Sequence, residues 1–302
     1  MPNASTASTQ GPVAVGVEST DAGRLAVAWA ADEAMLRRRP LRLVRAVDWP
    51  FVADEAPSAR TLSWQTPHER FRNANQHVLD EARAAVLARH PGLEVDERLT
   101  DGPPKRVLSA SAEDASMIVL GSRRMSSLQE AFTTGSIAVP VIAHASCPVA
   151  VVRYGEPAEL ASSTVVVGVD GSRSADLALG CAFEEASLRR ASVLAVSACP
   201  PLLGLDAAAL VTDTAVRDAR ETVERSIDAW RVRHPGVPAV GEVRLGHPVH
   251  LLTEASKNAL LLVVGTRGLG GFRRMLLGSV SYGLVHHTRC PLIVVPGPAD
   301  DE

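Results

Sequence analysis

The stretch Val165-Val166-Val167-Gly168-Val169-Asp170-Gly171 decides the fold, because it is the second copy of Val13-Ala14-Val15-Gly16-Val17-Glu18-Ser19. A β-branched run that ends in a glycine and a polar turn is typical of a strand buried on both faces. Further matches follow in the same order, ending with Cys290-Pro291, which repeats Cys147-Pro148. A period of about 150 residues is too long for a solenoid and indicates two duplicated domains.

Apolar strands alternate with amphipathic helices in each copy. In the second copy, Leu177, Cys181 and Leu188 keep helical spacing after the first strand, and His234-Pro235-Gly236 ends a later helix. This alternation predicts an α/β fold with a parallel sheet covered on both faces and joined by right-handed crossovers. The strands of the second copy are expected at 165–169, 193–196, 240–245, 260–264 and 292–295.

The length of 302 residues also suits two domains. The polar stretch 156–163 separates the two copies and is interpreted as a linker. The predicted divisions are a tail at 1–11, a first domain at 12–154, a linker at 155–163, a second domain at 164–297 and a tail at 298–302.

Composition excludes several classes of protein. A formal net charge of −3 argues against a uniformly basic nucleic-acid surface. The longest apolar runs have the length of a strand and are far too short to span a membrane, and the opening residues do not resemble a signal peptide. The 4 cysteines form no CxxC pair. We therefore expect a soluble, cytoplasmic protein that binds neither membrane nor nucleic acid.

A glycine-rich loop, 265–271, follows the fourth strand of the second copy and leads into Gly278-Ser279 at the start of a helix. Glycines let backbone amides approach phosphate oxygens, and a helix N-terminus favours an anion. Arg267, Arg273 and Arg274 could add charge-assisted hydrogen bonds. The loop is neither a Walker loop nor a dinucleotide fingerprint. A flexible turn followed by an ordinary Gly-Ser helix cap is the alternative interpretation.

The spacing Gly265-x-x-Gly268, nine residues, Gly278-Ser279 fits the G-2x-G-9x-G-[ST] signature of ATP-binding universal stress proteins. Asp170-Gly171-Ser172 after the first strand and the pair Gly246-x-Pro248 resemble the same family. Since the resemblance covers both copies, nearly the whole chain looks like a tandem universal stress protein.

The resemblance implies domains of five parallel strands in the order 3-2-1-4-5, with a Rossmann-like fold similar to the adenine nucleotide α-hydrolases. It also implies ATP as the ligand, with or without Mg²⁺. The Asp170 carboxylate would lie near adenine or ribose, although an Asx turn or helix cap is an equally good reading of an aspartate before Gly-Ser. Carried over by position, the nucleotide-binding residues are Gly168, Asp170, Val196, Gly265, Thr266, Arg267, Gly268, Gly278, Ser279, Val280 and Ser281.

The first copy departs from this pattern. Arg124 stands where the second glycine belongs, ten residues instead of nine precede Gly135, and Glu18 replaces the aspartate. We therefore expect the second copy to carry most of the nucleotide affinity. The weaker candidates in the first copy are Gly16, Gly121, Arg123, Gly135 and Ser136.

Three further features bear on assembly and chemistry. The fifth strands are apolar sheet edges, so the two domains are expected to pair through them, with a homodimer of chains as a further step. The pairs His144-x-x-Cys147 and His287-x-x-Cys290 have metal-ligand residue types, but each Cys-Pro directly precedes a buried strand, and no metal site is expected. No catalytic triad can be assembled.

The preferred function is that of an ATP-binding stress-response regulator with at most slow ATP hydrolysis, acting on an unknown protein partner. No general base and no lysine lie in the phosphate loop, so we do not expect an enzyme. The alternatives are a protein-interaction scaffold with a vestigial pocket and, less favoured, an enzyme of the adenine nucleotide α-hydrolase type.

Overall fold

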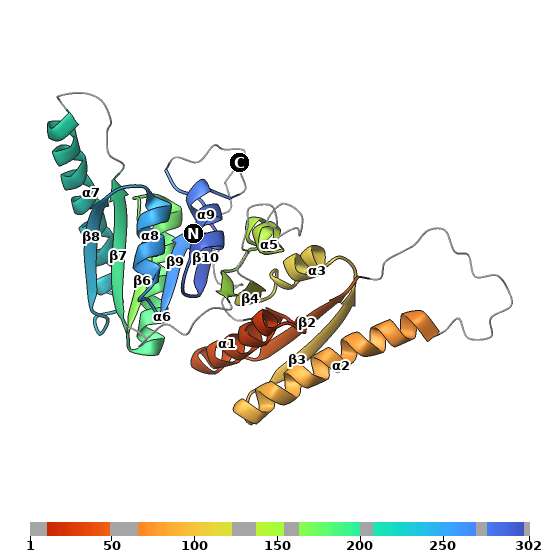
Figure 1. Ribbon diagram of the computed structural model, residues 1–302. Helices are drawn as coiled ribbons and strands as arrows, with labels where there is room; N and C mark the ends of the chain where they lie inside the picture. Colours follow the sequence, from red (N-terminus) through yellow and green to blue (C-terminus); the bar gives the residue numbers. More distant parts are fainter. Residues whose placement is uncertain are drawn as a thin grey trace, which may run out of the picture. The chain divides into compact units, whose positions relative to one another are not determined.

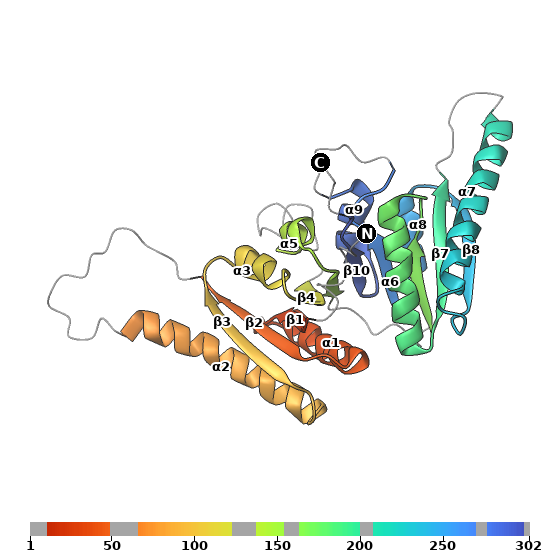
Figure 2. The same cartoon turned by 180° about the vertical axis from the view of Figure 1, so that it is seen from behind.

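The computed structural model describes residues 11–48, 66–122, 137–153, 163–199, 208–269 and 277–298. The chain divides into two compact units, Met1–Gly121 and Ser122–Glu302. Figure 1 shows the elements of both units, and Figure 2 shows them from behind. None of the helices in the described ranges has the length and apolar character needed to cross a membrane.

The first unit is a parallel sheet with helices on both faces. Its strands lie in the order β3-β2-β1-β4. Helices α1 and α2 pack side by side, and α3 packs against β2. The elements are β1 (Val13–Gly16), α1 (Asp21–Arg37), β2 (Leu41–Val47), α2 (Thr66–Arg89), β3 (Val95–Asp101), α3 (Pro104–Ser111) and β4 (Met117–Ser122).

The second unit holds the second copy together with the last helix and the last strand of the first copy. Its strands lie in the order β8-β7-β6-β9-β10-β5. Helices α6 and α7 cover one face of the sheet, and α8 lies on the other face beside α9 (Figures 1 and 2). The elements are α5 (Ala138–His144), β5 (Val149–Arg153), β6 (Thr164–Gly168), α6 (Arg173–Arg189), β7 (Ser192–Cys199), α7 (Ala208–Arg231), β8 (Ala239–Leu245), α8 (Pro248–Ser256), β9 (Leu261–Gly265), α9 (Ser279–His287) and β10 (Leu292–Val295).

The predicted strand order is confirmed in the second copy, where β8-β7-β6-β9-β10 is the order 3-2-1-4-5 with parallel neighbours. The pairing of fifth strands is also confirmed, because β5 and β10 are antiparallel with Ile293 opposite Ala150. Both strands are almost fully buried. Pairing thus satisfies the backbone of two apolar edges that would otherwise be exposed.

The duplication extends to the way the first helix of each copy begins and ends. The Thr20 hydroxyl caps α1 by accepting the Gly23 amide at 3.1 Å, and the Ser172 hydroxyl caps α6 by accepting the Ala175 amide at the same distance. Each helix is followed by an arginine with a left-handed backbone conformation, Arg38 after α1 and Arg190 after α6. The same local sequence therefore builds the same strand–helix unit twice.

Candidate functional site

The predicted site residues of the second copy gather at the carboxyl ends of β6, β7 and β9. Gly168 at the end of β6 lies beside Val196 of β7, and Gly265 ends β9 on the other side of β6. The chain leaves β6 towards β7, while its other neighbour β9 comes later in the sequence. This reversal of strand order is where open α/β sheets bind ligands.

Helix α9 begins directly against the end of β9. The Gly278 amide donates to the Thr266 carbonyl at 2.8 Å, and the Ser281 hydroxyl donates to the Gly265 carbonyl at 2.6 Å. Ser281 is 3% exposed, so this bond is sheltered from water. These contacts fix where the helix N-terminus lies relative to the sheet edge.

Within the described residues, the first turn of α9 offers hydrogen-bond donors that have no acceptor. Gly278 is the N-cap and has no side chain to cap the helix. Among the described residues, no group accepts a hydrogen bond from the amides of Ser279, Val280 and Ser281. Free amides at the positive end of a helix dipole are the arrangement that binds phosphate or sulfate.

Thr266 and Val196 are buried beside the crevice and accept hydrogen bonds from backbone amides of the fold. The Thr266 side chain is buried, and its hydroxyl accepts the Gly297 amide at 3.0 Å. Val196 is also buried, and its carbonyl accepts the Val169 amide at 3.0 Å. Arg267 is partly exposed at the mouth of the site.

Gly265 is required by packing. A Cβ atom at this position would lie 2.2 Å from the Ser174 hydroxyl oxygen in the first turn of α6. The matching Gly121 of the first copy is in the same situation, with the Ala22 carbonyl oxygen 2.7 Å from a Cβ placed there. The first glycine of the signature therefore has a packing role in both copies, including the one that lacks the second glycine, and its presence does not indicate nucleotide binding.

Asp170 forms the predicted Asx turn and also contacts the loop after β9. One carboxylate oxygen accepts the Ser172 amide at 3.0 Å, which is an Asx turn. The other accepts the Leu269 amide at 2.9 Å. Since Leu269 belongs to the loop after β9, the carboxylate joins the two loops that flank the crevice.

The first copy has an arginine at its own crevice that sequence analysis missed. The Arg45 guanidinium donates to the Val17 carbonyl at 2.7 Å and to the Asn75 side-chain oxygen at 2.8 Å. Burial lowers the pKa of Arg45, and the charge of Glu18 acts in the opposite direction. Ser197 holds the matching position in the second copy. The repeat alignment contained this signal, because an arginine in a mostly buried strand stands where the second copy has a serine.

Of the remaining candidates in the first copy, only Gly16 and Gly121 lie within the described residues. Gly16 lies at the end of β1, where a Cβ would be 3.2 Å from Leu108, and Gly121 packs as described above. Arg123, Gly135 and Ser136 lie outside the described residues, as do Arg273 and Arg274 of the second copy.

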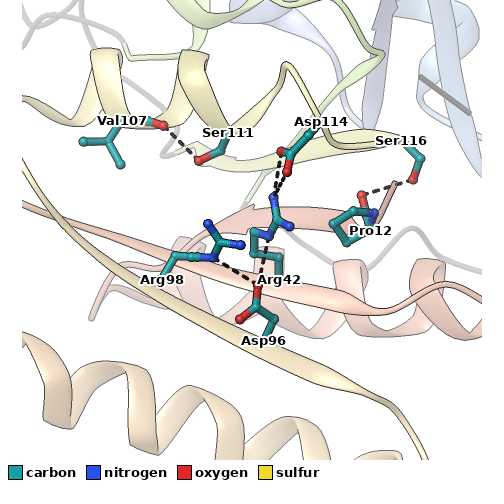
Figure 3. Close-up of polar contacts among 8 residues, drawn as sticks. All are labelled: Pro12, Arg42, Asp96, Arg98, Val107, Ser111, Asp114 and Ser116. Atoms are coloured by element: carbon teal, nitrogen blue, oxygen red, sulfur yellow. Dashed lines mark hydrogen bonds and ion pairs between the residues drawn. The ribbon is translucent and has the colours of Figure 1, made fainter. Parts of the chain in front are cut away.

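A second polar feature lies in the first unit, near the amino ends of its strands (Figure 3). Arg42 donates to both carboxylate oxygens of Asp114, at 2.7 and 2.8 Å, and to Asp96 at 3.1 Å. Arg98 also donates to Asp96. Arg42, Arg98 and Asp114 line a shallow cleft of about 280 Å³. Because these charges already pair with one another, the cluster is interpreted as a clamp between β2, β3 and the start of β4.

This clamp predicts an acid-sensitive contribution to stability. The hydrogen bond from Arg42 is the main cause that lowers the pKa of Asp114 below its ordinary value of 3.8. A carboxyl group with a lowered folded-state pKa stabilises the fold above its ordinary value, and this stabilisation is lost as the pH falls through the folded pKa. Urea unfolding of wild type and Arg42→Met should therefore differ most above pH 3.8 and converge below it.

Arg106→Met is the matched control, because Arg106 is exposed on α3. This variant should show no such pH dependence. A difference between wild type and Arg42→Met that stays constant from pH 7 to strongly acidic pH would contradict the interpretation.

One residue of each His-x-x-Cys pair has a contact or a degree of burial that fits a structural role. Burial raises the pKa of the Cys290 thiol to about 12, which keeps it protonated. A ring nitrogen of His144 lies 2.8 Å from the Pro140 carbonyl. In the ranges that the structure describes, no three His, Cys, Asp or Glu residues are placed to hold a metal ion.

Comparisons with known proteins agree on one family. The model of the universal stress protein family matches residues 11–153 and 162–296. A universal stress protein of Mycobacterium tuberculosis is 32% identical over 290 residues, which cover 93% of this chain and 96% of the relative.

Solved structures match as well. The crystal structure of a universal stress protein from Archaeoglobus fulgidus has a TM-score of 0.69 and 16% identity, with 98% of this chain and 99% of that chain covered. A universal stress protein in complex with cAMP matches 44% of this chain and 95% of its own, with 26% identity and a TM-score of 0.35.

Proposed function

Because the chain belongs to the universal stress protein family, we propose that its C-terminal copy binds ATP and that the protein acts as a nucleotide-dependent regulator of the stress response. The observation that carries this proposal is the first turn of α9, where the amides of Ser279, Val280 and Ser281 have no acceptor in the described structure. An anion is the ligand that such a helix end favours.

The described residues fit a polyphosphate. Gly278 leaves the helix end open, since it has no side chain to occupy the free amides. Its φ of −70° shows that the glycine is not needed for backbone conformation, so its advantages are the close packing against Thr266 and an open approach to the helix end. Gly168, Val196, Gly265, Thr266, Arg267 and Gly268 would form the sides of the nucleotide site.

We expect one nucleotide per chain, in the second copy. At the matching crevice of the first copy, Arg45 donates a hydrogen bond to the Val17 carbonyl just after β1. Arg45 also lies close enough to Glu18 for their charges to interact. A ligand would have to displace this internal contact, and displacing a partly buried charged hydrogen bond is costly.

Hydrolysis would be slow at most. Asp170 is the carboxylate in the described part of the crevice, and both of its oxygens already accept backbone amides. It is therefore poorly placed to take a proton from an attacking water. Mg²⁺, a homodimer and a cytoplasmic location remain part of this proposal.

The second candidate is a protein-interaction scaffold whose pockets are vestigial. The contact between Arg45 and the Val17 carbonyl in the first copy favours it, because that copy keeps Gly121 without an intact signature. An enzyme of the adenine nucleotide α-hydrolase type is the least supported reading, because strand one lacks the phosphate loop of the ATP pyrophosphatases.

Acid extraction of the purified protein, followed by chromatography of the supernatant, tests the proposal. ATP or ADP should be recovered at about one equivalent per chain, and titration of the stripped protein should restore the same stoichiometry. An empty extract, together with no binding of ATP, ADP or cAMP up to about 1 mM, would replace the proposal with the scaffold. Release of pyrophosphate from ATP would favour the enzyme.

A further inference from the structure

Helices α8 and α9 of the second unit carry a surface with an excess of positive charge. Four of its side chains are exposed: His250 and Lys257 on and directly after α8, and His287 and Arg289 at the end of α9 and just beyond it. The two helices pack against each other (Figure 1), and the Arg289 amide donates to the Ser256 hydroxyl at 3.0 Å, which joins their C-terminal ends. These four exposed side chains are called the basic face.

A single carboxylate accompanies the basic face. Glu254 is the one acidic residue of α5, α8 and α9, the described helices on this side of the sheet. It pairs with Lys257 at 2.6 Å. The hydrogen bond from Lys257 is the main cause that lowers the pKa of Glu254, and the charges of His250 and Arg289 act in the same direction. Glu254 therefore offsets one positive charge and leaves the others available, on a chain whose formal net charge is −3.

The first copy lacks these charges at the matching positions. Glu113 stands where the second copy has Lys257, and Ser146 stands where it has Arg289. Both copies nevertheless form the corresponding helices, α3 and α5 in the first copy, so the fold does not require either cation. Attraction between a cation and the C-terminal end of a helix would act in both copies alike, and it does not explain the difference.

An aromatic side chain lies on the same helix as the basic face. Tyr282 of α9 is 46% exposed, and its ring stands edge-on to the ring of His286, with 4.9 Å between the ring centroids. Arg153 of β5 donates to the His286 carbonyl at 2.8 Å, which fixes the end of α9 to the sheet. Tyrosine and arginine on rigid elements are the residue types that contribute most to binding at protein interfaces.

We propose that the basic face, together with Tyr282, is a docking surface for an acidic segment of a partner protein. Complementary charge would bring the segment to the surface, and Tyr282 would pack against its apolar atoms. A nucleic acid fits less well, because its tight binding uses about six or more phosphate contacts and the whole chain is negatively charged. The inference goes beyond the proposed function and does not depend on ATP, since His287 and Arg289 lie at the opposite end of α9 from the proposed nucleotide site.

Charge reversal on the full chain tests the proposal. The probe is a short peptide that alternates Glu with Leu, titrated into the ¹⁵N-labelled protein and followed by NMR. The amide signals of Lys257, His287 and Arg289 should shift, with a Kd of about 1 mM or below at low salt. The double variant Lys257→Glu/Arg289→Glu should bind at least tenfold more weakly, because like charges would then face the peptide.

Arg217→Glu/Arg220→Glu is the matched control. Both arginines are exposed on α7, which covers the other face of the sheet and carries 5 acidic residues beside its 4 arginines. This variant makes the same change in net charge and should bind the peptide as wild type does. Equal weakening in the two double variants would overturn the proposal, because net charge alone would then account for the binding.

Three further outcomes decide the inference. Absence of shifts at the basic face would overturn it, and so would a single-stranded DNA probe that shifted the same signals at lower concentration than the peptide. If Lys257→Glu/Arg289→Glu failed to fold, Lys257→Gln/Arg289→Gln would replace it and should still weaken binding. Peptide shifts in a protein that bound no ATP would leave the docking surface standing while the proposed function failed.

Discussion

Gly278→Asp is expected to weaken ATP binding at least a hundredfold while the protein stays folded. Gly278 is the N-cap of α9 with φ −70° and ψ 154°, a conformation that aspartate readily adopts. An aspartate there would accept hydrogen bonds from the free amides of the first turn and would add a negative charge where phosphate is proposed to bind. It would therefore replace the ligand with a side chain of the protein.

The folded state should tolerate this change. Aspartate caps helices slightly better than glycine, by a few tenths of a kcal/mol. Its Cβ would lie 3.2 Å from the Thr266 carbonyl oxygen, a tight contact that a small shift relieves. The melting temperature in the absence of nucleotide should stay near that of wild type, and thermal denaturation with and without ATP measures both effects in one experiment.

Two controls define what the loss of binding means. Gly278→Asn also caps the helix but carries no charge, so it should weaken binding less than Gly278→Asp. Gly135→Asp makes the same change at the matching sequence position of the first copy and should leave the nucleotide stoichiometry unchanged. If Gly135→Asp abolished binding while Gly278→Asp left it intact, the assignment of the site to the second copy would be wrong.

Glu185→Gln is expected to destabilise the fold by about 3 kcal/mol, because it removes one partner of a buried ion pair. Glu185 is 0% exposed within α6 and pairs with Arg189 one turn later. The arginine side chain is 15% exposed, so the variant would leave a largely buried positive charge without its carboxylate. The first copy repeats the arrangement with Glu33, which is also 0% exposed, and Arg37.

Urea unfolding of the full chain, followed by far-UV circular dichroism, measures this loss. Glu184→Gln is the matched control, since Glu184 is the adjacent residue on the same helix and is exposed. Its effect should stay within about 0.5 kcal/mol of zero. Equal stabilities for Glu185→Gln and Glu184→Gln would show that the buried pair contributes nothing net to the fold.

Sequence predicted the duplication and the alternation of strands and helices, the family resemblance implied the strand order of the second copy, and the two apolar sheet edges predicted the pairing of β5 with β10. The duplication and the alternation rest on local patterns, namely β-branched runs for buried strands and helical spacing between them. Sequence also identified the residues that meet at the carboxyl ends of β6 and β9, because the topology of a parallel sheet brings those ends to one edge.

Only the tertiary structure decided what individual residues do there. Gly265 is a glycine because α6 packs against it, and Gly268 lies against the Asp170 carboxylate. Arg45 donates a hydrogen bond to the Val17 carbonyl, just after β1 in the first copy. Each of these contacts joins residues from different elements, and their distances follow from how helices pack on the sheet. A local sequence pattern identifies one residue of such a contact but does not show which distant residue will lie against it. Sequence could therefore identify the glycines of the signature without giving the physical reason for them.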